Sequence, residues 1–235
     1  MIDSPRGRER YAWLAGVLFV VALVAEAIVA VGVKLNQDDS AVKMARGLQD
    51  HHKRLVLIAC LSILYAPAFV VYLSRLHGLF RERTDRSSLL HTWVLVGGVL
   101  FVTLHGVSDI GITGLVGAKV AAYSAAHEPG VSYSLYLLTF ALDSVGDVFA
   151  SLFMVATGLL VLRTRALPGW LGWTAIAAGP FLFAQTFGLG GVISSVGLVL
   201  DLIGFLFLLI FVLASGLILF ARPDKPGASP ARVTA

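Results

Sequence analysis

Residues 135–162 read LYLLTFALDSVGDVFASLFMVATGLLVL, an apolar run that contains only two charged side chains, Asp143 and Asp147. A helix of about 20 apolar residues crosses ~30 Å of hydrocarbon, and a lipid-exposed backbone must satisfy its own hydrogen bonds by being helical. The run therefore predicts a transmembrane helix that carries two carboxyl groups inside the membrane. A carboxylate in apolar surroundings is costly and usually binds a partner or keeps its proton.

The composition of the whole chain agrees with this interpretation. Hydrophobic residues make up 57% of the 235 residues, charged residues 14%, and the mean hydropathy is +0.86. Globular proteins have about 25% charged residues. The pI near 9.4 does not indicate nucleic acid, because the basic residues flank apolar runs, where they determine topology. The composition predicts an all-α membrane protein whose partner is the lipid bilayer, with no nucleic acid.

The other apolar runs predict a polytopic transmembrane bundle of about six helices. The expected spans are 11–33, 55–73, 89–116, 133–162, 170–187 and 192–220. Together they form a single transmembrane domain over residues 1–221, with a tight turn at the GLGG of 188–191. The tail, residues 222–235, is rich in Pro and charge and has nothing to bury, so we expect it to be disordered.

Basic residues predict how the bundle is oriented. Of the 18 Lys and Arg residues, 12 lie in the N-terminus, the second and fourth loops and the tail, and six lie in the other loops. Cytoplasmic loops carry an excess of Lys and Arg, and Trp rings settle at the headgroup level. All four Trp residues fall at the ends of spans that the basic residues mark as inner. We therefore expect an inner (cytoplasmic) membrane protein with both termini in the cytoplasm.

Six ionisable side chains fall inside the expected spans. They are Glu26, His105, Asp109, Asp143, Asp147 and Asp201. Counted from the outer ends at 1.5 Å per residue, the acids lie at depths of roughly 10–20 Å, mostly in one leaflet. No Lys or Arg lies at a comparable depth. The acids are therefore expected to face a common cavity, where protons, a metal, a cationic ligand or water would relieve their charge.

Helical spacing indicates which of these side chains share a face. The sets are Asp143, Asp147 and Ser151 in the fourth span, His105 and Asp109 in the third, and Ser194 and Asp201 in the sixth. Polar residues of transmembrane helices point to the bundle interior, and small residues mark close helix contacts. The five acids are candidates for a proton donor or a cation site. His105, Ser151 and Ser194 are candidates for substrate binding.

Like carboxylates in a low-dielectric site cannot all ionise, so at least one is expected to keep its proton, which suits a proton relay or a cation site. A divalent metal is the alternative, because His105 and Asp109, or Asp143 and Asp147, are spaced to chelate from one helix turn. The structural alternative is that each acid pairs with its own bonded partner. No G-x-S-x-G, P-loop or H-E-x-x-H motif supports another chemistry.

Two further segments carry expectations. Gly111, Gly114 and Gly117 are spaced three apart with no preceding strand, so a packing or helix-loosening role is expected rather than dinucleotide binding. In segment 37–54, Ser40 is expected to cap a short helix. That helix either lies over the outer mouth of the cavity or is a solvated extension of the second span.

The junction LRTRALPGWLGWTAIAAG, residues 162–179, resembles that of a family of bacterial multi-pass membrane proteins of unknown function. The matching residues are Arg163, Leu167, Pro168, Leu171 and Gly172. This resemblance implies a similar overall architecture and no activity. The intramembrane acids are also similar to those of small integral-membrane terpene cyclases, which usually have seven spans. In addition, DSVGD at 143–147 resembles the Mg²⁺-binding aspartates of membrane prenyltransferases, although a second Asp-rich motif is missing.

These observations leave three hypotheses about function. The first is binding or translocation of a small cationic or proton-coupled solute by the acids in the outer half of the bundle. The second is a membrane-embedded enzyme that acts on a lipid or isoprenoid by acid-initiated or metal-assisted chemistry, with a carboxylic acid as the proton donor. The third is a structural or accessory subunit. An apolar cavity that opens sideways to lipid would favour the enzyme, and a hydrated funnel would favour transport.

Overall fold

The structure is a computed structural model that describes residues 11–33, 39–83, 88–184 and 194–221. The side chains of residues 115–118, 121, 125, 194–198 and 201 lie outside this description. The predicted turn at 188–191 and the predicted disordered tail at 222–235 also lie outside the described residues.

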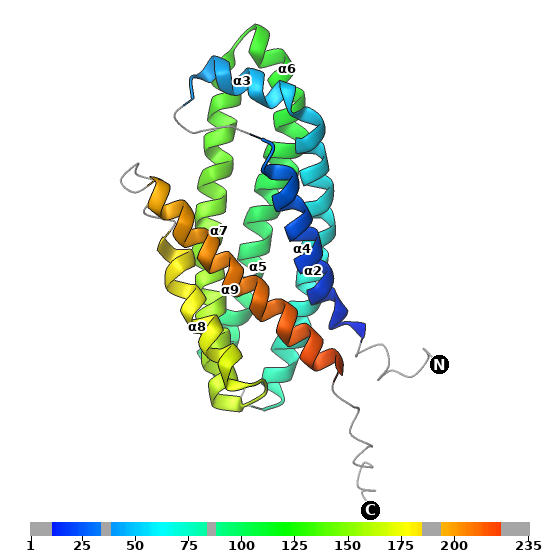
Figure 1. Cartoon of the computed structure of the whole chain (residues 1–235), viewed down its shortest axis with the longest axis vertical. Helices are drawn as coiled ribbons and strands as arrows, with labels where there is room; N and C mark the ends of the chain where they lie inside the picture. Colours follow the sequence, from blue (N-terminus) through cyan, green and yellow to red (C-terminus); the bar gives the residue numbers. More distant parts are fainter. Residues whose placement is uncertain (1–10, 34–38, 84–87, 185–193, 222–235) are drawn as a thin grey trace, which may run out of the picture.

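Every regular element in the described part of the chain is helical (Figure 1), so the predicted all-α fold is confirmed. The elements are α2 Leu14–Ala30, α3 Ala41–Asp50, α4 His52–Arg81, α5 Leu89–Gly106, the π-helix η1 Val107–Gly117, α6 Ala118–Ala126, α7 Pro129–Thr164, α8 Gly169–Ala184 and α9 Ser194–Ala221. Pro129 occupies the first turn of α7, where its missing N–H costs nothing.

Four segments within the described residues are long and apolar enough to cross a membrane: His52–Arg81, Leu89–Gly114, Pro129–Thr164 and Leu202–Ala221. The protein is therefore a multi-pass membrane protein. The other two expected spans contain α2 and α8, which are apolar but have only 17 and 16 residues. At 1.5 Å per residue these helices are roughly 24–26 Å long, less than the ~30 Å of hydrocarbon. The number of six spans thus stays a prediction.

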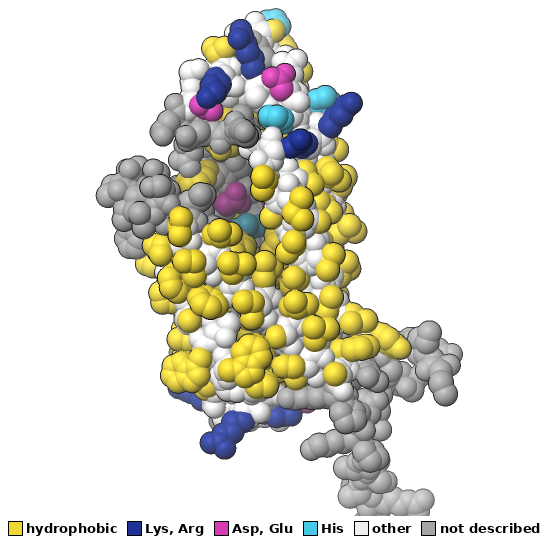
Figure 2. All heavy atoms as spheres, viewed as in Figure 1, with side chains coloured by type: hydrophobic (Ala, Val, Ile, Leu, Met, Phe, Trp, Pro, Cys, Tyr) yellow, Lys and Arg dark blue, Asp and Glu magenta, His cyan; other side chains and the backbone are white. Residues whose placement is uncertain are grey.

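The helices form an elongated bundle with distinct ends (Figure 1). Helices α3 and α6 lie across one end, which we call the α3 end. The start of α2 and the end of α9 lie at the opposite end, where the rings of Tyr11 and Phe220 are 6.0 Å apart. On the face seen in Figure 2, apolar side chains cover a broad band between charged side chains at the two ends. This distribution is that of a protein surrounded by lipid.

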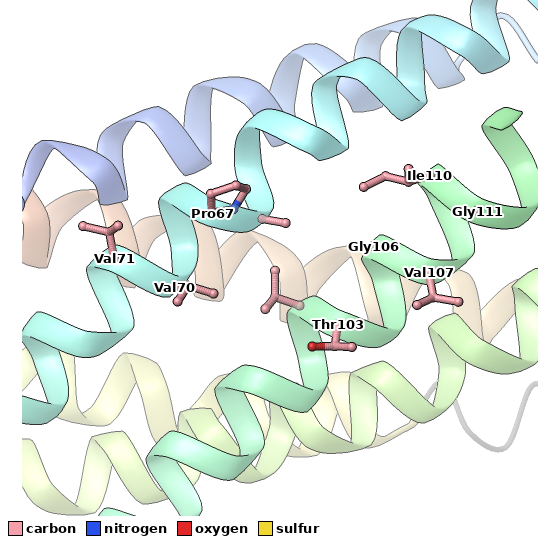
Figure 3. A pocket seen from close by; sticks show the side chains of 10 residues that line it. Pro67, Val70, Val71, Thr103, Gly106, Val107, Ile110 and Gly111 are labelled. Atoms are coloured by element: carbon pink, nitrogen blue, oxygen red, sulfur yellow. The ribbon is translucent and has the colours of Figure 1, made fainter.

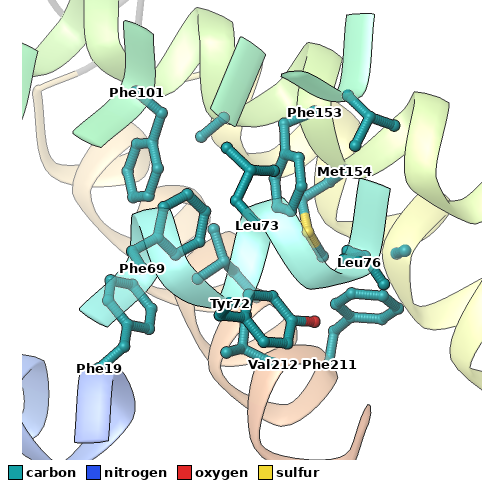
Figure 4. Close-up of a cluster of buried hydrophobic side chains, with 14 of the residues drawn as sticks. Phe19, Phe69, Tyr72, Leu73, Leu76, Phe101, Phe153, Met154, Phe211 and Val212 are labelled. Carbon is teal, nitrogen blue, oxygen red and sulfur yellow. The ribbon is translucent and has the colours of Figure 1, made fainter. Parts of the chain in front are cut away.

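Aromatic side chains from five helices build the core (Figure 4). They include Phe19 of α2, Phe69 and Tyr72 of α4, Phe101 of α5, Phe153 of α7 and Phe211 of α9. Phe69 is central, because its ring centroid lies 4.8 to 5.6 Å from those of Phe19, Phe101 and Phe153. Such aromatic pairs add about 0.5–1.5 kcal/mol each beyond the area that they bury. The core therefore holds α2, α4, α5 and α7 in fixed positions below the α3 end.

Glycines let the helices of the bundle approach one another closely. A Cβ on Gly97 of α5 would lie 2.9 Å from backbone atoms of α7, and one on Gly158 of α7 would lie 2.6 Å from a carbonyl oxygen of α8. A Cβ on Gly204 of α9 would lie 2.8 Å from a backbone nitrogen of α8. Close backbone contacts at small residues are the main device of helix packing in membranes.

The third expected span, 89–116, changes helix type within the bundle. Helix α5 ends at Gly106 and continues as η1, whose π-helical geometry is rare and often found at functional sites. A Cβ on Gly114 would overlap that of Ala59 on α4, whereas one on Gly111 would meet open space. The expected packing role therefore holds for Gly114, and the loosening of the helix is observed as η1.

Helix α3 covers the end of the bundle. Ser40 caps it as predicted, since its Oγ accepts a hydrogen bond from the Lys43 N–H at 3.3 Å. Met44, Ala45 and Leu48 are buried, and α3 packs on α6 and α7. Helix α4 begins directly afterwards at His52, so α3 crosses the bundle and does not extend the second span.

Candidate functional site

Glu26, His105, Asp109, Asp143 and Asp147 lie together inside the bundle, and we call these five residues the acid cluster. They come from α2, α5, η1 and α7. The spacing of Asp143 and Asp147 within one helix indicates that they share a face. Packing between helices then brings four of the five predicted acids and the predicted histidine into one site.

Helix α4 supplies two hydroxyl groups that connect Glu26 and Asp109. The Tyr65 hydroxyl donates to Asp109 Oδ2 at 2.7 Å, and Ser62 Oγ lies 3.4 Å from the same oxygen and 3.5 Å from Glu26 Oε2. Ser62 Oγ is also 3.0 Å from the carbonyl oxygen of Ile58. A serine has one proton to donate, so it can serve only one of these acceptors, while its lone pairs can accept from a protonated carboxyl group.

The imidazole of His105 pairs with Asp147. Its Nδ1 lies 3.1 Å from the carbonyl oxygen of Phe101, which can only accept, so Nδ1 carries a hydrogen and donates it. Nε2 then faces Asp147 Oδ1 at 3.3 Å. A bare Nε2 and a carboxylate oxygen are both acceptors, so this contact is favourable only with a proton between them. The pair holds one proton and is neutral as a whole.

The absence of a side chain at Gly146 leaves room for the His105 ring. A Cβ on this residue would lie 2.5 Å from Nδ1 and 2.6 Å from Cε1 of the imidazole. On its other sides the ring lies 4.8 Å from the Phe101 centroid and 6.1 Å from the Phe205 centroid. The ring therefore lies against the bare backbone of α7, with aromatic rings of α5 and α9 beside it.

Asp143 is the acid whose hydrogen bonding is incomplete. Its Oδ1 is buried and accepts no hydrogen bond within the described residues. The Ser108 hydroxyl interacts with the carboxyl group but also lies within 3.3 Å of the Thr139 carbonyl oxygen, and it has one proton to donate. A buried acceptor without a donor costs about 1–3 kcal/mol, and more when it is charged. Asp143 is thus where a proton, water or ligand is needed.

Carboxyl groups outnumber cationic groups in the cluster. Among the described residues, no ion pair joins Glu26, Asp109 or Asp143 to a Lys or Arg, and His105 is the cationic neighbour that acts on all three acids. Because the His105–Asp147 pair is neutral overall, these three acids are left without a cationic partner among the described side chains. The same residues contain no group of three or more His, Cys, Asp or Glu arranged to hold a metal ion. The roles of His105, Asp109, Asp143 and Asp147 as metal ligands stay a prediction.

The remaining candidates lie elsewhere or outside the description. Ser151 is buried against α8, with its Oγ 3.5 Å from the place of a Cβ on Gly179. Ser194 and Asp201 belong to α9, but their side chains lie outside the described residues.

Sequence reasoning missed the contributions of α4. Ser62 and Tyr65 are polar residues three apart in the apolar run 55–73, which places them on one helix face. That spacing was the available signal for a polar contact from the second span. For Gly146 the signal was weaker, because a glycine inside a helix is most often a packing residue.

A crevice of about 560 Å³ opens between α2 and α9 beside the cluster. On the face seen in Figure 2, a hollow has acidic and histidine side chains at its floor. The crevice is lined by aliphatic and aromatic residues such as Leu23, Ile28, Phe205 and Leu206, and Glu26 is the ionisable residue among its described lining. It is therefore an apolar opening that reaches the acid cluster from the side of the bundle.

A second groove differs in this respect. It lies between α4 and the α5–η1 helix, has a volume of about 700 Å³ and is lined by Pro67, Val70, Thr103 and their neighbours (Figure 3). No ionisable residue is among its described lining. Its position beside η1 does not bring it into contact with a carboxyl group of the described lining.

Comparison with known proteins gives one match. The family described as Domain of unknown function (DUF4386) matches residues 14–217, which run from the start of α2 into the last turns of α9. No curated protein and no solved structure matches the chain. The match agrees with the expected membership of a family of unknown function, and it brings no activity with it.

Proposed function

Because the chain belongs to the DUF4386 family, which has no known function, its activity has to be sought in the site itself. We propose that the acid cluster binds a small cationic solute in exchange for protons inside the membrane. In this proposal the acids lie in the outer half of a six-span bundle in the inner membrane, with both termini in the cytoplasm.

The imbalance of charge carries the proposal. Glu26, Asp109 and Asp143 have no cationic partner among the described residues, and Asp143 Oδ1 accepts no hydrogen bond there. Ionised carboxyl groups in such surroundings are costly, so protons or a bound cation must relieve them. A cation with N–H donors satisfies both the charge and the open acceptor.

The contacts around the cluster suit an exchange of protons. The lone pairs of Ser62 can accept a hydrogen bond from a protonated Glu26 or Asp109. His105 Nε2 and Asp147 Oδ1 are 3.3 Å apart, so one proton can be shared between them. When a cation approaches Glu26, Asp109 and Asp143, these acids can release their protons. The His105–Asp147 pair keeps its single proton and stays neutral, so it positions the neighbouring acids without competing for the cation.

The test is binding of methylammonium to the protein in nanodiscs, with proton release followed by a pH-sensitive dye in weak buffer. We expect saturable binding with release of protons. Asp143→Asn keeps the shape of the side chain but removes its charge, so affinity should fall about tenfold or more. The matched control is Asp50→Asn, the same change at an exposed position of α3, which should leave binding unchanged.

Thermal unfolding decides whether a variant is informative. Asp143→Asn should be as stable as the wild type or more stable, because it replaces a buried ionisable group that lacks a full set of partners. A folded wild-type protein that neither binds methylammonium nor exchanges protons would overturn the proposal and leave the enzyme and the accessory-subunit alternatives.

The apolar crevice favours a second candidate, chemistry on a lipid or isoprenoid started by a carboxylic acid. Glu26 lies where an apolar chain from the bilayer could reach a carboxyl group. Mass spectrometry of polyprenyl substrates incubated with the protein tests this candidate. A product that forms with the wild type and not with Glu26→Gln would support the enzyme, while binding without any product supports the solute-binding function.

A further inference from the structure

We infer that the cationic solute is an amphiphilic amine, whose apolar chain lies in the crevice between α2 and α9 while its ammonium group contacts Glu26. This inference rests on the proposed function and adds the chemical class of the solute and its route. The solute enters sideways from the bilayer, along the crevice, and not from the water at either end of the bundle.

The chemistry of the crevice matches such a molecule in both of its parts. Ile28 and Leu206, on its two walls, are 70% and 50% exposed, so they are open to a lipid chain. Glu26 lies between such apolar residues and is half-buried. A single carboxyl group in an apolar crevice is complementary to one positive charge on an apolar body.

Glu26 belongs to both the crevice and the cluster. Its Oε2 lies 3.5 Å from Ser62 Oγ, which in turn lies 3.4 Å from Asp109 Oδ2. On the opposite wall of the crevice, the Phe205 ring is 6.1 Å from that of His105. An ammonium group at Glu26 is therefore one side chain away from the acids that lack a cationic partner.

The dimensions also fit a small ligand with one chain. The volume of about 560 Å³ lies within the roughly 300–1,000 Å³ of small-molecule sites. On this wall the lining runs from Leu23 of α2 to Val31, the residue after its end, which is roughly 12 Å along the helix axis. The groove between α4 and η1 is as large and as apolar but has no ionisable residue in its described lining, so it offers nothing to a cation.

The experiment compares two amines that carry the same ammonium group, methylammonium and octylammonium, on the full chain in nanodiscs. Empty nanodiscs supply the background for octylammonium partitioning into lipid. Each methylene that leaves water for an apolar site is worth about fourfold in affinity, so burying half of the added chain predicts about 100-fold tighter saturable binding of octylammonium. Glu26→Gln should weaken the binding of both amines.

Variants that obstruct the crevice distinguish the contribution of the amine's alkyl chain to affinity from that of its ammonium group. Leu206→Trp fills the crevice with an indole ring at an exposed position, so it should weaken the binding of octylammonium about tenfold or more and weaken the binding of methylammonium much less. Leu202→Trp, at the next turn of α9, provides a second variant should the first unfold. Val70→Trp is the matched control, because Val70 is an exposed residue that lines the other groove.

The outcomes distinguish this inference from the proposed function. Binding of methylammonium decides the proposed function, and the ratio between the two amines decides the inference. Equal affinities for the two amines, or octylammonium binding that Leu206→Trp and Leu202→Trp leave intact, would overturn the inference alone. Saturable binding of octanol as tight as that of octylammonium would also overturn it, because the occupant would then be a neutral lipid.

Discussion

His105 depends on a neighbour that has no side chain. Its Nδ1 bonds to the Phe101 carbonyl and its Nε2 faces Asp147, and both contacts require the ring to lie against the backbone at Gly146. Only a glycine leaves room there, since a Cβ would lie 2.5 Å from Nδ1. At this scale the acid cluster is an arrangement of hydrogen-bond donors and acceptors whose count is incomplete without a ligand or additional protons.

Gly146→Ala tests this dependence. The added methyl group should displace the imidazole from Asp147, lower the free energy of unfolding by about 1–3 kcal/mol and weaken methylammonium binding. The measurements are thermal unfolding and binding in nanodiscs. The control is Gly106→Ala, directly after His105, where a Cβ meets nothing within 4 Å. Unchanged binding in a folded Gly146→Ala protein would contradict a role for the position of His105.

Between elements, the turn from α7 to α8 explains the junction that resembles a family of unknown function. Helix α7 ends at Thr164 and is followed by Arg165, which has a positive φ of 50°, and α8 begins at Gly169. Leu167 and Leu171 are buried, and Gly158 of α7 faces the carbonyl oxygen of Gly172. The junction therefore holds two helices at close distance, which is a structural role.

Gly158→Ala should separate these two helices. Its Cβ would lie 2.6 Å from a backbone oxygen that cannot move aside, so we expect a loss of about 1–3 kcal/mol in the free energy of unfolding. Thermal unfolding in detergent measures the effect. Gly78→Ala, in α4, has nothing within 4 Å and should be neutral or stabilising by up to about 1 kcal/mol. An equal response of the two variants would show that helix propensity, and not the close contact, determines stability.

For the molecule as a whole, the basic residues predict its orientation in the membrane. The starts of α2 and α5 and the ends of α4 and α9 share one end of the bundle (Figure 1), and that end is expected to be cytoplasmic. In a Cys60→Ser background, a membrane-impermeant maleimide added to intact cells should label Arg46→Cys on α3. It should label Glu82→Cys, after α4, only when the cells are opened.

The opposite labelling pattern would show that the orientation of the bundle in the membrane is the reverse of the predicted one. The acids would then lie in the inner leaflet, while their mutual contacts and the crevice would be unchanged, since those depend only on how the helices pack. The cation-binding proposal is therefore independent of this result, and only the side from which protons exchange would change.

The local sequence determined the helices of this protein. The run 133–162 lies within α7, Pro129–Thr164, and 192–220 nearly coincides with α9, Ser194–Ala221. Length, apolarity and helical period are properties of neighbouring residues, so they can be read from one segment at a time. The same local rules indicated the inward face of Asp143 and Asp147 and the capping of α3 by Ser40.

Only the tertiary structure decided what meets the acids. The pairing of His105 with Asp147, the hydroxyl groups of Ser62 and Tyr65, and the crevice beside Glu26 join residues from different helices. Helical period indicates which way a side chain points but not which neighbour it will find, because packing between distant segments is set by glycine contacts and by the aromatic core. Those contacts convert a series of buried carboxyl groups into one site with an opening toward the lipid.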